Sequence, residues 1–88
     1  MSTTKLYSVR FGKRISITRH ARERMAQRAI GDNVLVELLE RGRIRYKDSR
    51  RAWVAMAFDG RNDNLLCAAV SVEDELVVKT VMHRFRWE

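Results

Sequence analysis

The chain contains no proline, only one cysteine and no apolar run of about 18 residues, the length that a membrane-spanning helix needs. Without proline, no helix or strand has to be interrupted. Cys67 alone cannot form an intramolecular disulfide, and one cysteine with two histidines argues against a structural zinc site. The first residues, MSTTKLYSVRFGKR, lack the apolar core of a signal peptide. These absences predict a cytoplasmic protein without a metal, a cofactor or a membrane association.

Length and composition predict one small globular domain. The 88 residues are 45% hydrophobic, which is ordinary for a folded domain and argues against disorder. No internal repeat, linker or low-complexity tract divides the sequence. We therefore expect residues 1–88 to form a single domain, of the size at which stability is marginal.

Basic residues exceed acidic ones by seven and gather in two blocks. Residues 10–28 contain seven Arg or Lys and one Glu, and residues 41–51 contain six Arg or Lys and one Asp. Arginine outnumbers lysine by fourteen to four, and guanidinium groups suit bidentate contacts with phosphate. The blocks indicate a face that binds a polyanion, either nucleic acid or an acidic protein segment. A solvated basic surface without a ligand would have the same pattern.

Two segments have the apolar spacing of helices. In residues 18–28 good helix formers follow Thr18, whose hydroxyl can cap a helix N-terminus. In residues 33–41 apolar side chains recur at helical spacing after Asp32, a second candidate cap. Gly42 follows as a helix stop.

From residue 43 onward the pattern changes to the period of β-strands. The tract 65–72 is continuously apolar, which predicts a central strand buried on both faces. Residues 59–64 are rich in turn formers, and residues 73–75 form an acidic turn. This order predicts an α+β domain with two N-terminal helices packed on a three- to four-stranded antiparallel β-meander. Strands are expected near 44–46, 52–58, 65–72 and 76–85, with an edge strand at 5–11, a turn at 12–14 and a short extended segment at 15–17.

The first helix combines a polar stripe with an apolar one. Positions four apart share a helix side, so His20, Arg24 and Arg28 form one stripe. Ala21 and Met25 form another, through which the helix would dock. We expect the helix to present an imidazole flanked by guanidinium groups.

The run ITRHARERMAQRAI, a helix ending in ERG and a meander ending in VVKTVMHR together resemble a family of small bacterial proteins catalogued as a domain of unknown function. The motif of that family is Thr-x-His-Ala-x-x-Arg-Met-x-x-Arg, and it is matched here by Thr18, His20, Ala21, Arg24, Met25 and Arg28. Family members are grouped with the RelE-like and BrnT-like ribonuclease toxins of toxin–antitoxin pairs. The resemblance implies a RelE/BrnT-like fold, a metal-independent endoribonuclease and a cognate antitoxin whose acidic segment covers the basic face.

The resemblance assigns catalytic roles to His20, Arg24, Arg28 and Thr80. Cleavage without a metal requires deprotonation of the 2′-hydroxyl, protonation of the leaving 5′-oxygen and stabilisation of the charged phosphorane. An imidazole can transfer the protons, and guanidinium groups can stabilise the charge. Alternatively, His20 is a helix N-terminal residue that bonds local backbone.

His83 is the other candidate for proton transfer. Strand alternation places it on the face of Val77, Lys79 and Val81, opposite to Thr80, unless a bulge intervenes. One of the two residues is therefore expected not to be catalytic. The family motif favours Thr80, whereas the chemistry of a second imidazole favours His83.

Backbone phosphates of RNA would bind basic side chains near these residues. Alternation places Arg43, Arg45 and Lys47 on one strand face. The complete set of nucleic-acid-binding candidates is Arg14, Arg19, Arg43, Arg45, Lys47, Arg50, Arg51 and Lys79. Aromatic side chains could stack on unpaired bases, although core packing is favoured for Trp53; Trp87 is expected to be exposed, and Cys67 to be inert core.

Two other functions fit the same features. A non-catalytic nucleic-acid-binding protein would need only the basic blocks, with His20 incidental. A toxin that inhibits a topoisomerase would use its arginines to contact a protein.

Overall fold

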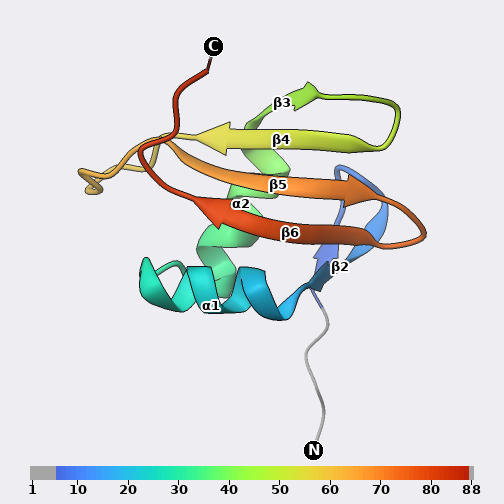
Figure 1. Ribbon diagram of the computed structural model, residues 1–88, viewed down its shortest axis with the longest axis horizontal. Coiled ribbons are helices and arrows are strands. Elements are labelled where there is room, and N and C mark those ends of the chain that lie inside the picture. The colour runs from blue at the N-terminus through green and yellow to red at the C-terminus, as the bar shows by residue number, and fades with distance from the viewer. Residues whose placement is uncertain (1–5, 88) are drawn as a thin grey trace, which may run out of the picture.

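Figure 1 shows the computed structural model, which describes residues 6–87. A curled six-stranded sheet has the strand order β1-β2-β6-β5-β4-β3, and two helices pack against it. Every neighbouring pair is antiparallel except β2 and β6, which are parallel. The elements are β1 (Tyr7–Ser8), β2 (Lys13–Ile17), α1 (Arg19–Gln27), α2 (Asp32–Arg41), β3 (Arg43–Tyr46), β4 (Arg51–Met56), β5 (Leu66–Val72) and β6 (Leu76–Met82).

The predicted fold class was wrong, because the sheet is mixed and larger than a three- to four-stranded meander. Two strands precede the helices, and β2 extends the sheet by pairing in parallel with residues Leu76 to Val78 of β6. The predicted turn at 12–14 lies at 9–12 instead, so Lys13 and Arg14 belong to β2. Of the predicted edge strand at 5–11 only β1 forms, and residue 5 lies outside the described residues.

The N-terminus of α1 confirms the predicted cap. The Thr18 hydroxyl accepts a hydrogen bond from the Ala21 amide and donates one to the Lys79 carbonyl, both at 3.1 Å. The first bond satisfies an amide that has no partner within the helix, and the second fixes the helix to β6. Ala21 and Met25 are 0% and 3% exposed, which confirms the apolar stripe. Helix α1 lies alongside β6, beyond the end of its pairing with β2 (Figure 1).

Helix α2 covers the far face of the sheet in Figure 1 and buries Leu35, Leu38 and Leu39 completely. Its N-cap is Gly31 rather than the predicted Asp32, which is the first helical residue and forms an ion pair with Arg22 at 2.5 Å. A carboxylate in the first turn is favourable because it faces the positive end of the helix dipole.

Glu40 and Arg10 fasten the turn after β1 to the C-terminal end of α2. The Glu40 carboxylate accepts hydrogen bonds from the Ser8 hydroxyl at 2.5 Å and from the Val9 and Arg10 amides at 2.7 and 3.1 Å. The Arg10 guanidinium donates to the carbonyls of Leu39 and Gly42 at 3.2 and 2.6 Å. Arg10 thereby satisfies carbonyls at a helix end that have no helical partner, so this arginine of the first basic block has a structural role.

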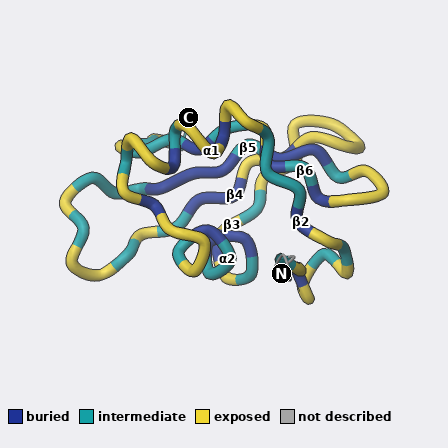
Figure 2. Tube along the Cα trace, turned by 90° about the horizontal axis from the view of Figure 1, so that it is seen from below, coloured by how far each residue is buried: buried dark blue, intermediate teal, exposed yellow. Residues whose placement is uncertain are grey.

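The core lies between the sheet and the helices, and Figure 2 shows the buried stretches of the central strands. The prediction that residues 65–72 form a central strand buried on both faces is confirmed, because β5 lies between β4 and β6 and is largely buried. A bulge places Lys79 of β6 between the pairs Ala69–Thr80 and Val70–Val78. Val81 consequently joins Leu76 and Val78 in the core, which strict alternation did not predict.

Candidate active site

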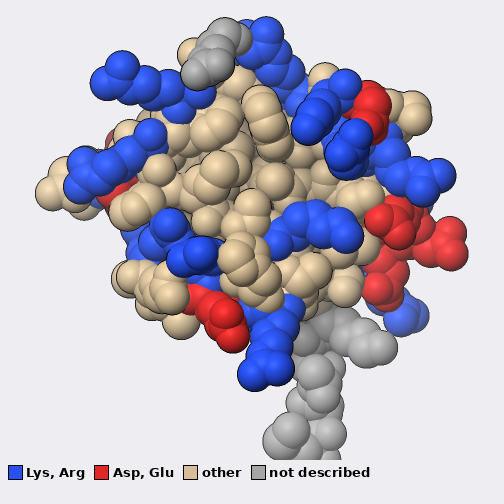
Figure 3. All heavy atoms as spheres, in the orientation of Figure 1, with Lys and Arg blue, Asp and Glu red and all other residues tan. Residues whose placement is uncertain are grey.

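The side of the sheet opposite α2, here called the open face, carries basic side chains and no acidic one at its strand positions. The strand register places on it Arg43 and Arg45 of β3, Arg51, Trp53 and Ala55 of β4, Cys67, Ala69 and Ser71 of β5, and Val77, Lys79, Thr80 and Met82 of β6. Figure 3 views the molecule from this side and shows Lys and Arg around a centre of other residues, with groups of Asp and Glu at the right-hand and lower edges. The open face is therefore suited to a polyanion.

The C-terminal segment, residues 84–87, folds onto one end of the open face. The Phe85 amide donates to the Leu65 carbonyl at 3.0 Å, and the Phe85 ring meets the rings of Trp53 and Trp87 edge to face, with centroids 5.8 and 5.0 Å apart. Cys67 is 0% exposed although its position faces this side, which indicates that the segment covers it. Burial raises the pKa of the Cys67 thiol to about 12, in agreement with the predicted inert cysteine.

Trp53 was expected in the core, but it stands on the open face and is 37% exposed. The guanidinium carbons of Arg43 and Arg45 lie 5.3 and 5.9 Å from the centre of the Trp87 ring, within the range of cation–π contacts. Trp87, expected to be exposed, is half-buried.

At the end of β6, His83 forms a hydrogen-bonded pair with Asp63. The Nδ1 atom of His83 lies 3.3 Å from Oδ2 of Asp63, and the two side chains are 35% and 14% exposed. Arg61 donates to both oxygens of Asp63 at 2.9 Å and also to the carbonyls of Arg28 and Ala29 at 2.8 and 3.2 Å. Arg61 therefore fixes the Asp63 carboxylate in place. The carboxylate can then hold one tautomer of the His83 imidazole, as catalytic carboxylate–histidine pairs do.

Asp63 and Arg61 were missed in the sequence because both lie among turn formers. Their link to His83 depends on the β5–β6 hairpin, which is centred near Asp74 and returns residue 83 to the level of residue 65. Counting outward from the acidic turn places residue 65 opposite His83, two residues from Asp63, but does not show the contact between the two side chains. The Asp63 carbonyl also accepts the Arg84 amide at 2.8 Å, and Arg84 has the left-handed φ of 53° with which the chain leaves the strand.

The hydrogen bonds from the Arg61 guanidinium hold the pKa of Asp63 well below its ordinary value of 3.8, and the His83 bond acts in the same direction. A depressed pKa in the folded state stabilises the protein above pH 3.8, and this contribution is lost as the pH falls below that value.

We expect the difference in free energy of unfolding between the wild type and Asp63→Asn to be largest near neutral pH and to shrink towards about pH 3. Urea unfolding at both pH values measures it; Asp48, whose pKa is also lowered, is present in both proteins and cancels. A difference that stays constant over this range would contradict the assignment.

The five predicted catalytic residues do not form one cluster. Of these five residues, all within the described part of the chain, only His83 and the backbone of Arg28 form hydrogen bonds with Arg61 or Asp63. His20 is exposed in the first turn of α1, and Arg24 donates to the Gln27 amide oxygen at 2.9 Å. The bulge places Thr80 on the open face, and within residues 6–87 no hydrogen bond joins it to His20 or His83.

Arg28 is half-buried at the C-terminal end of α1. Its Nε and Nη1 atoms are buried and have no hydrogen-bond partner among the described residues. Buried donors without a partner are unfavourable, and a charged group more so.

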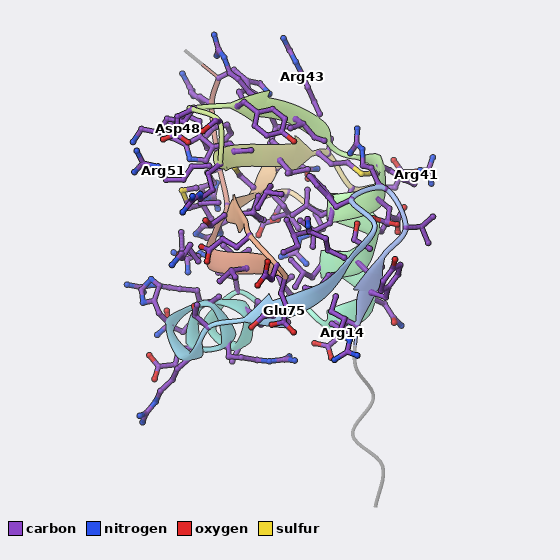
Figure 4. The ribbon with its side chains drawn as sticks, turned by 90° about the vertical axis from the view of Figure 1, so that its right-hand side faces the viewer. Arg14, Arg41, Arg43, Asp48, Arg51 and Glu75 are labelled. Atoms are coloured by element: carbon purple, nitrogen blue, oxygen red, sulfur yellow. The ribbon has the colours of Figure 1, made fainter. Side chains whose placement is uncertain are left out.

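The predicted nucleic-acid-binding residues are divided between the open face and other surfaces. Arg43, Arg45, Arg51 and Lys79 occupy open-face positions, although Arg51 also pairs with Asp48 at 2.7 Å. Figure 4 shows Arg51 and Asp48 close together and Arg43 extending away from the sheet. The prediction that Lys47 shares a strand face with Arg43 was wrong, because β3 ends at Tyr46. Arg14, Arg19, Lys47 and Arg50 are exposed; Arg50 lies beside Arg51 and Lys79 at the edge of the open face, and Arg19 pairs with Glu23 at 3.6 Å.

Two structural features are absent from residues 6–87. In this part of the chain no group of three or more His, Cys, Asp or Glu side chains is arranged to hold a metal ion. Neither helix there has the length and apolar character needed to cross a membrane.

Comparison with known proteins gave one match. Residues 17–83 match the model of a family described as a domain of unknown function, DUF4258. Comparisons with curated proteins and with solved structures gave no match. The matched region contains α1, α2, strands β3 to β6 and the Asp63–His83 pair, whereas the C-terminal segment lies beyond it.

Proposed function

The chain belongs to the DUF4258 family of domains of unknown function, and we propose that it is a metal-independent ribonuclease acting as the toxin of a type II toxin–antitoxin pair. The observation that carries the proposal is the Asp63–His83 pair at one end of a basic sheet face. The helix motif from Thr18 to Arg28 supports the proposal, because the family that this motif resembles is grouped with RelE- and BrnT-like ribonuclease toxins.

In the proposed reaction, His83 acts as the general base. Its Nδ1–H is held by the Asp63 carboxylate, and within residues 6–87 its Nε2 has no hydrogen-bond partner. Nε2 would take the proton of a 2′-hydroxyl, whose oxygen attacks the adjacent phosphorus and forms a 2′,3′-cyclic phosphate. The bond from phosphorus to the 5′-oxygen breaks, and that oxygen leaves as a hydroxyl after taking a proton from solvent water; the imidazolium then returns its proton to the hydroxide that forms. Asp63 would stabilise the imidazolium that forms.

Arg28 is the best candidate to stabilise the phosphorane. Its backbone carbonyl is joined to the Asp63–His83 pair through Arg61, and its guanidinium would stabilise the negative charge that develops on the phosphate. Guanidinium groups present planar pairs of donors that match phosphate oxygens.

A second function, nucleic-acid binding without cleavage, is favoured by one observation. The rings of Trp53, Phe85 and Trp87 gather on the open face beside Arg43 and Arg45, an arrangement typical of proteins that bind single strands. Binding of this kind does not require His83.

Induced expression in a bacterium tests the proposal. We expect growth arrest with breaks in messenger RNA, both abolished by His83→Ala and relieved by a small acidic antitoxin encoded beside the gene. A matched His20→Ala variant shows whether the imidazole of α1 is also required. Intact RNA with an SOS response would indicate a topoisomerase inhibitor instead, and absence of toxicity with salt-sensitive nucleic-acid binding would indicate the non-catalytic function.

A further inference from the structure

Both tryptophans of the chain lie in one cluster on the open face, together with Phe85; we call Trp53, Phe85 and Trp87 the aromatic cluster. We propose that the aromatic cluster is a stacking site for unpaired bases of single-stranded RNA. This inference rests on the proposed function in taking RNA as the ligand, and it adds where the strand is held and why a single strand is preferred.

The geometry leaves ring surface available on Trp53, which is 37% exposed, whereas the Trp87 ring is already contacted by the guanidinium groups of Arg43 and Arg45. The ring planes cross at 73° and 88°, so each ring meets its neighbour edge to face rather than in a parallel stack. Below the cluster the open-face positions hold the small side chains of Ala55, Cys67 and Ala69. The rings therefore lie above the sheet. Trp53 remains 37% exposed although its strand, β4, lies between β5 and β3.

Charge on the same face favours a strand with phosphates between its bases. Arg43 and Arg45 lie over the Trp87 ring, and Lys79 is exposed on β6. The strand positions around the aromatic cluster include no acidic residue, and the carboxylates of Asp48 and Glu73 contact Arg51 and Ser71 towards the other end of the face. Proteins that bind single strands without sequence specificity combine cationic side chains, which contact phosphates, with aromatic rings, on which bases stack. In a duplex the bases are already stacked and paired, so the rings would have nothing to bind.

Tryptophan fluorescence tests this site directly, because both tryptophans belong to it. The probe is a short 2′-O-methyl oligouridine, which lacks the attacking hydroxyl and therefore reports binding without cleavage. A strand with the same phosphates but abasic sugars is the control ligand, and the oligouridine annealed to its complement is the duplex control. We expect the single-stranded oligouridine to quench the tryptophan fluorescence. We expect the abasic strand to bind about 5- to 150-fold more weakly than the oligouridine. Trp53→Ala should weaken binding of the base-containing strand by a similar factor.

Tyr46→Ala is the matched variant, since Tyr46 is an exposed aromatic residue of β3 whose position faces the α2 side. It should leave binding unchanged. Equal affinity for the base-containing and abasic strands, or tighter binding of the duplex, would overturn the stacking site; neither comparison requires a variant to fold. Because the probe cannot be cleaved, stacking without ribonuclease activity would refute the proposed function alone, and cleavage without stacking would refute this inference alone.

Discussion

Replacing His83 with alanine is expected to lower the rate of RNA cleavage by about 10²- to 10⁴-fold, the usual contribution of a general base. His83 is partly exposed and lies outside the core, so its loss should change the free energy of unfolding by only about 0.5 kcal/mol. Single-turnover cleavage of a labelled single-stranded RNA measures the rate, and circular dichroism of the same sample shows whether the fold is retained.

Asp63→Asn distinguishes an oriented imidazole from an imidazole acting alone. The amide keeps the size of the carboxylate but can hold the wrong tautomer and cannot stabilise an imidazolium, so the rate should also fall by more than about tenfold. His20→Ala is the matched histidine control, on an exposed helix surface. If His20→Ala abolishes cleavage while His83→Ala does not, proton transfer belongs to α1 and the role proposed for His83 is wrong.

Replacing Gly42 with alanine is expected to destabilise the protein by about 3 kcal/mol, at the upper end of the range for overpacking. Gly42 is buried where α2 passes into β3, and its φ of −70° is open to any residue. A Cβ there would lie 2.5 Å from the Leu38 carbonyl oxygen and 2.8 Å from Cγ1 of Val54, so backbone has to move. Urea unfolding monitored by circular dichroism measures the loss.

Gly31→Ala is the matched control. Gly31 also borders α2, has an ordinary φ of −82°, and a Cβ there would meet nothing within 4 Å. We expect its free energy of unfolding to change by no more than about 1 kcal/mol, since only a weak cap is altered. Similar losses in the two variants would show that the cause is helix capping rather than the close approach of α2 to β4.

Local signals in the sequence predicted the elements that depend on neighbouring residues. The Thr18 cap, the buried Ala21–Met25 stripe and the apolar strand β5 were all predictable, since each follows from spacing within a few residues. Gly42 was predicted as a helix stop, but its reason is the contact with Val54, which no local pattern contains.

Pairings between distant residues were not predictable in the same way. Parallel strands β2 and β6 are separated by both helices, and β2 is too short to carry a strong strand pattern. The bulge at Lys79 moves the side chains of Thr80, Val81 and Met82 to the opposite faces, and no Gly marks it in the sequence. For the candidate site, the helix motif indicated His20 and Arg28, whereas the pairing of His83 with Asp63 required the geometry of two hairpins.

The most direct measurement of the central claim is the chemistry of the RNA ends that the purified wild-type protein produces. We expect cleavage of single-stranded RNA in excess EDTA, with 2′,3′-cyclic phosphate and 5′-hydroxyl ends, and loss of these products with His83→Ala. Failure of the wild type to cleave RNA, cleavage that stops when EDTA is added, or products with 5′-phosphate ends would contradict it.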